Sequence, residues 1–94
     1  MAFLLQLRAA KTEDDVVAAA KDYLRVWEQV LHRLPKSCQL QVHDIDGVLS
    51  AADTLERFRE QALRLEGTVS HELGMTAAFF STAAARIREL QAPE

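Results

Sequence analysis

Two stretches of this chain place apolar residues alternately three and four positions apart, and this spacing constrains the fold more than any other feature. It matches the turn of an α-helix and puts the apolar side chains of each stretch on one face. A chain with two such faces buries them by packing helices against each other. The first face consists of Val17, Ala20, Leu24, Trp27, Leu31 and Leu34, and the second of Val48, Ala51, Leu55, Phe58, Ala62 and Leu65.

The first face lies between recognisable start and stop signals. Thr12 is followed three positions later by Asp15, and this spacing is that of a capping box, in which two side chains satisfy free N–H groups at a helix start. Pro35 cannot continue a helix, because it lacks an N–H group and its ring clashes with the preceding turn. These signals predict a helix over about 13–34.

The remaining helices follow from similar signals. Gly67 comes two residues after the second face and suits a left-handed helix end, which predicts a helix over about 46–66. Apolar residues at helical spacing predict further helices over about 2–10 and 68–91. The expected fold is therefore all-α: a single domain over residues 1–94, built as a small antiparallel bundle of three long helices plus a short N-terminal helix.

Charge and cysteine content exclude several classes of function. The formal net charge is -3, and the basic residues are spread along the chain and mostly accompanied by acids, so we expect no nucleic-acid partner. The N-terminal apolar run is short and interrupted by Arg8, so we expect neither a signal peptide nor a membrane span. The single cysteine, Cys38, has no internal disulfide partner, and this favours a cytoplasmic location.

The sequence DIDGVL at residues 44–49 holds two aspartates one residue apart. It resembles the nucleophile loop of the haloacid-dehalogenase-type phosphatases, in which Asp44 would be the nucleophile and Asp46 the acid/base beside magnesium. That loop follows a buried parallel strand, whereas Gln39 to Val42 alternates polar and apolar residues. Capping of the next helix by Asp44 or Asp46 is the simpler explanation of the stretch, because it requires no strand and no metal site. We therefore expect no enzymatic activity.

Two histidines are candidate phosphoacceptors. His43, followed by Asp46 and Gly47, resembles the site of histidine phosphotransfer domains, which are small acidic helical bundles with an exposed helical histidine. In that family a lysine stands where this chain has Asp46. His71, within residues 69–73, resembles the phosphoacceptor box of sensor histidine kinases. A phosphotransfer module using His43, with His71 as the second choice, is the alternative function; a surface or capping role is the favoured explanation for both residues.

Interaction with another protein is the first functional hypothesis. The histidines lack zinc-site spacing and no glycine-rich phosphate loop occurs, so we expect no metal and no cofactor. The apolar faces exceed what three short helices need, which indicates a non-catalytic adaptor, chaperone or regulatory module that binds a partner protein or forms a homodimer. A stripe of small residues would allow close helix packing, either within the chain or between copies; its members are Gly74, Ala78, Ser81 and Ala85.

Overall fold

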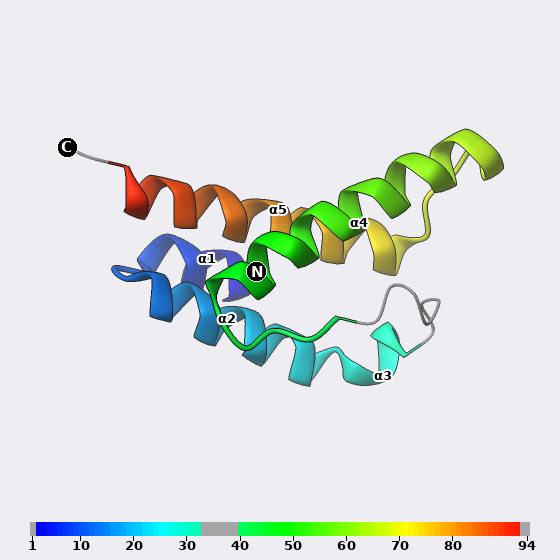
Figure 1. Ribbon diagram of the computed structural model, residues 1–94. Helices are drawn as coiled ribbons and strands as arrows, with labels where there is room; N and C mark the ends of the chain where they lie inside the picture. The colour runs from blue at the N-terminus through cyan, green and yellow to red at the C-terminus, as the bar shows by residue number, and fades with distance from the viewer. Residues whose placement is uncertain (1, 33–39, 93–94) are drawn as a thin grey trace.

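The computed structural model describes residues 2–32 and 40–92, and these residues form five α-helices and no strand. The helices are α1 (Ala2–Ala9), α2 (Glu13–Val26), α3 (Glu28–Leu31), α4 (Ile45–Glu66) and α5 (His71–Gln91). Helices α4 and α5 form a long antiparallel hairpin, and α1 and α2 pack against it (Figure 1). The all-α prediction is confirmed. Within the described ranges, no helix has both the length and the apolar character needed to cross a membrane.

The predicted caps account for the helix ends. The Thr12 hydroxyl accepts a hydrogen bond from the Asp15 N–H at 3.2 Å, and the Asp15 carboxylate accepts one from the Thr12 N–H at 3.2 Å. Asp44 caps α4, its carboxylate accepting from the Gly47 N–H at 2.8 Å. Gly67 ends α4 with a φ of 74°, the left-handed conformation that glycine adopts without strain. The capping interpretation of the DIDGVL stretch is thus confirmed for its first aspartate.

The predicted helix over 13–34 is wrong as a single element. Helix α2 ends at Val26, because Trp27 has φ −98° and ψ 13°, outside helical geometry. The four-residue α3 follows directly, and residues 33 and 34 lie outside the described part of the chain. The spacing of apolar residues does not predict such a break, because it indicates which face of a helix a side chain occupies and is unaffected by a change in one ψ angle.

Three long helices in a bundle are therefore not confirmed. Helices α4 and α5 are long, with 22 and 21 residues, whereas α2 has 14. The predicted helix over 68–91 starts later, at His71, because the Ser70 hydroxyl caps it by accepting from the Leu73 N–H at 3.3 Å. The ranges predicted for α1 and α4 agree with the structure to within one residue.

The core lies around α5, which contacts α1, α2 and α4. Large side chains from all four helices are fully buried there; they include Leu7, Val16, Leu55, Phe80 and Ile87. Arg86 adds a polar connection, donating one hydrogen bond to the Ala10 carbonyl oxygen at 2.5 Å and another to the Glu89 carboxylate at 3.0 Å. Because that carbonyl follows the end of α1, the guanidinium fixes α1 on α5.

Candidate functional site

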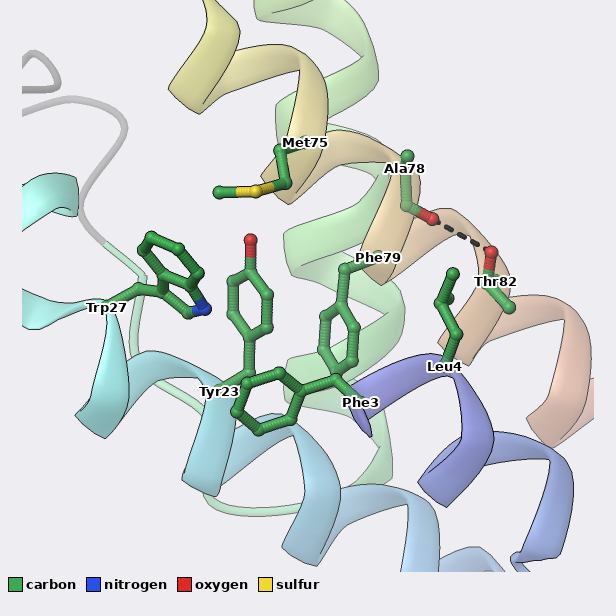
Figure 2. Close-up of a pocket in the computed structure, with 8 residues that line it drawn as sticks. All are labelled: Phe3, Leu4, Tyr23, Trp27, Met75, Ala78, Phe79 and Thr82. Atoms are coloured by element: carbon green, nitrogen blue, oxygen red, sulfur yellow. Dashed lines mark hydrogen bonds between the residues drawn. The ribbon is translucent and has the colours of Figure 1, made fainter. Parts of the chain in front are cut away.

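An apolar pocket of about 140 Å³ lies where α1, α2 and α5 meet (Figure 2). Its lining residues carry no charge. Tyr23 and Phe79 are buried, and Ala78 and Thr82 are exposed at the rim. The half-buried lining residues are Phe3, Leu4, Trp27 and Met75. The pocket thus has a packed apolar interior and an edge that reaches the surface.

Aromatic rings give the pocket a defined shape. The rings of Tyr23 and Phe79 stack with centroids 4.2 Å apart and planes 8° from parallel. Phe3 from α1 meets both of them edge-on, at 5.2 Å and 6.1 Å. Offset stacks and edge-to-face contacts are the favoured arrangements of aromatic pairs, so these side chains hold one another in place.

Most polar atoms around the pocket are satisfied within the chain, with one exception. The Tyr23 hydroxyl lies 3.0 Å from the Thr76 hydroxyl, and burial raises the pKa of the Tyr23 phenol, an effect that this hydrogen bond only partly opposes. Thr82 donates to the Ala78 carbonyl oxygen at 2.9 Å. The indole nitrogen Nε1 of Trp27 is buried and has no hydrogen-bond partner among the described residues. Trp27 therefore presents an unused donor beside an apolar pocket.

A second hollow, of about 320 Å³, is lined in part by His43. The imidazole is exposed and lies just before the α4 cap Asp44, so His43 is not on a helix. Lys21 and Asp14 from α2 line the same hollow. The hollow therefore contains a cation and two carboxylates beside the histidine. Across residues 2–32 and 40–92, no group of three or more histidine, cysteine, aspartate or glutamate side chains is placed to hold a metal ion.

His71 lies far from this hollow. It is the first residue of α5 and is exposed, next to the C-terminal end of α4, whereas His43 precedes the N-terminal end of that helix. The 22 residues of α4 span about 33 Å. The two candidate phosphoacceptors are therefore separate positions and do not form one site.

The second predicted apolar face is buried along only half of its length. Val48 and Leu55 are fully buried where α4 packs on α2 and α5. The solvent exposure of the residues that follow on the same face increases: Phe58 and Ala62 are half-buried, and Leu65 is 75% exposed. In Figure 1 this end of α4 rises away from α2 and α3. We refer to Phe58, Ala62 and Leu65 as the distal face.

The stripe of small residues on α5 lies mostly at the surface of the described part of the chain. Ala78, Ser81 and Ala85 are exposed, and only Gly74 is half-buried. Of the two explanations that the sequence left open, close packing inside the chain is therefore wrong for these three residues. Ala78 instead lies at the rim of the apolar pocket.

Sequence reasoning found the histidines and the apolar faces but not the apolar pocket. Trp27 was placed on a core face, and its half-buried position agrees with that only in part. Nothing in the local sequence marks its indole as a site, since the pocket is assembled from helices far apart in the chain. Comparison with protein-family models, characterised proteins and solved structures finds no match to this chain, so the function is argued from geometry alone.

Proposed function

We propose that this chain is a non-catalytic protein–protein interaction module, built as a small helical bundle, that binds an apolar helical segment through the distal face. The observation that supports this is the loss of burial along one continuous face of α4. Leu55 is 0% exposed and Leu65, ten residues later on the same side of the helix, is 75% exposed. The apolar repeat thus runs along the whole face of α4, whereas the neighbouring helices bury only the first half of that face.

An amphipathic helix is the kind of partner that fits such a face. Its own apolar residues, repeated every three or four positions, would continue the packing that α5 provides to the buried half. The exposed Arg57 and Arg59 flank Phe58 in the sequence, and each forms an ion pair on the surface of α4, Arg57 with Asp53 at 3.0 Å and Arg59 with Glu56 at 3.6 Å. An apolar centre with a polar rim is the usual composition of a protein interface. The helix belongs to another protein or to a second copy of this chain.

Two matched variants test the role of the distal face. Leu65→Glu places a charge on it, whereas Leu63→Glu places the same charge on the other side of the same helix, because successive residues turn by about 100°. Leu63 is itself 46% exposed, so both variants are expected to fold. Immobilised wild-type protein and both variants are exposed to lysate from the source of the chain, and light scattering measures their mass in solution.

We expect one stoichiometric protein to be retained by the wild type and by Leu63→Glu and lost with Leu65→Glu. If the partner is a second copy, the same pattern appears as a dimer that only Leu65→Glu converts to a monomer. Retention or dimerisation that is equal in all three proteins would rule out the distal face as the interface. A monomer that retains nothing would rule out the interaction module itself.

Phosphotransfer through His43 is the second candidate function, and one observation favours it. Lys21 lines the same hollow as His43, and its ammonium group would stabilise a phosphorylated imidazole in place of the lysine that phosphotransfer domains carry in their motif. Asp14 and Asp44 line the same hollow and act against the added charge. Whether His43 can carry a phosphoryl group therefore depends on the balance between attraction by the lysine and repulsion by the two carboxylates.

Phosphoramidate, a small phosphoryl donor, tests this candidate. Mass spectrometry locates the phosphoryl group, and the exposed His32 serves as an internal control for unselective transfer. We expect modification at His43 in preference to His32 and His71, and faster loss of the phosphoryl group in a Lys21→Gln variant. Equal modification of the three histidines would exclude a specialised phosphoacceptor.

A further inference from the structure

The buried Nε1 of Trp27 is the feature that the interaction function leaves unexplained. Its N–H group has no acceptor among the described residues, although buried polar groups in proteins are nearly always paired. The hydroxyl groups nearby do not accept this N–H, and each makes a hydrogen bond elsewhere. Tyr23 is paired with Thr76 at 3.0 Å, and Thr82 donates to a backbone carbonyl.

The ring of Tyr23 does not replace the missing acceptor. Figure 2 shows the indole nitrogen on the side of the Trp27 ring that faces Tyr23, and the two ring centroids are 6.2 Å apart with planes inclined by 36°. An aromatic face accepts a hydrogen bond much more weakly than a carbonyl oxygen does. The donor is therefore unpaired among the described residues, and because its nitrogen is covered from solvent, an acceptor that enters the pocket reaches it by displacing the neighbouring side chains.

We propose that the apolar pocket binds a small neutral aromatic molecule of one ring that carries one hydrogen-bond acceptor, and that the acceptor receives the N–H of Trp27. The volume of about 140 Å³ is close to that of an apolar cavity known to hold benzene, roughly 150 Å³. The rings of Phe3, Tyr23 and Phe79 offer faces and edges for a further ring. The uncharged lining favours a neutral ligand, since a charge would lose its hydration without gaining a partner.

The ligand has a route into the pocket. Ala78 and Thr82 at the rim are exposed, and the alanine side chain is small enough to leave the edge open. This site shares no residue with the distal face, so it is independent of the proposed interaction. It would give the chain a ligand-binding function in addition to a partner-binding one.

A pair of isosteric probes tests the proposal. Acetophenone carries a carbonyl oxygen, and α-methylstyrene has nearly the same shape with a CH₂ group in its place. Trp27 is the only tryptophan in the chain, so the ¹⁵N-labelled protein gives a single indole N–H signal. We expect acetophenone to bind saturably, to move this signal downfield, and to bind roughly fivefold tighter than α-methylstyrene, the contribution of one neutral hydrogen bond.

Three variants locate the binding. Trp27→Phe keeps an aromatic ring but removes the donor, and should bind both probes with equal affinity. Ala78→Leu fills the rim and should abolish binding of both. Ala85→Leu makes the same change seven residues further along the exposed small-residue stripe, outside the pocket, and should bind as the wild type does. Helical circular dichroism of each variant confirms that it is folded.

Each contrary result overturns a defined part of the proposal. Absence of saturable binding by either probe to the wild type would refute the pocket as a ligand site. Equal affinity for both probes with an unmoved indole signal would refute the role of Trp27 as donor. Binding that Ala78→Leu leaves unchanged, or that Ala85→Leu abolishes equally, would refute the pocket as the place where the probes bind. None of these results depends on whether the distal face binds a partner.

Discussion

The hydroxyl of Tyr23 on α2 lies 3.0 Å from the hydroxyl of Thr76 on α5, and both residues are buried. Either oxygen can donate the hydrogen bond. The contact joins residues 53 positions apart in the chain and fixes α2 against the central helix. Because the ring of Tyr23 also stacks on Phe79, the same hydrogen bond helps to hold the inner wall of the apolar pocket in place.

The two hydroxyls should contribute to stability as a coupled pair and not independently. Thr76→Val leaves the Tyr23 hydroxyl buried without a partner and should lower the free energy of unfolding by about 1–3 kcal/mol. Tyr23→Phe likewise leaves the Thr76 hydroxyl buried without its partner. The double variant should lose less than the sum of the two single losses, measured by urea denaturation. Strictly additive losses would mean that the two hydroxyls do not interact.

Stability should fall at alkaline pH because of Tyr23. Burial raises the pKa of its phenol above the ordinary value of 10.0, so the folded state keeps the proton that the unfolded chain releases first. The stabilisation is complete below pH 10.0 and is lost as the pH rises through the folded pKa. Tyr23 is the only tyrosine, so phenolate absorbance reports its titration directly. Tyr23→Phe should show a smaller alkaline loss of stability; an identical loss would assign the effect to other groups.

The two ends of the second apolar face should differ in their contribution to stability. Leu55→Ala removes a fully buried side chain and should cost about 2–5 kcal/mol, because it leaves a cavity as well as losing apolar contacts. Leu65→Ala should change stability by no more than about 0.5 kcal/mol, since this side chain is already exposed. Thermal or urea unfolding of the isolated chain measures both. A large loss with Leu65→Ala would indicate that the distal face is covered in solution.

Two glycine substitutions should have opposite effects. Gly67→Ala should destabilise by about 1–2 kcal/mol although nothing lies within 4 Å of the added methyl group, because its φ of 74° is strained for an L-residue. Gly74→Ala lies within helix α5, where the nearest neighbouring atom is a Val69 methyl carbon at 3.8 Å, an ordinary contact. This change should stabilise by up to about 1 kcal/mol through higher helix propensity. Denaturation midpoints of the two variants should therefore shift in opposite directions.

The helices and most of their ends could be predicted from the sequence because the interactions that create them are local. The Thr12–Asp15 box, the Asp44 cap and the Gly67 end each involve atoms no more than four residues apart. Apolar spacing likewise identifies a helical face from neighbouring turns alone. The exception is Trp27, where the break between α2 and α3 leaves the spacing of side chains unchanged.

Only the tertiary structure decided which part of each face is buried and what the helices enclose. The repeat that includes Leu55 continues unchanged to Leu65, yet the C-terminal end of α4 lies away from α2 and α3 (Figure 1), and which turns of α4 another helix covers is a property of the assembled fold. The apolar pocket depends in the same way on side chains such as Phe3, Tyr23 and Phe79, which come from three helices. The sequence by itself determined local hydrogen bonding and helix periodicity; the exposed distal face and the indole donor, unpaired among the described residues, arise from long-range packing, which no local pattern encodes.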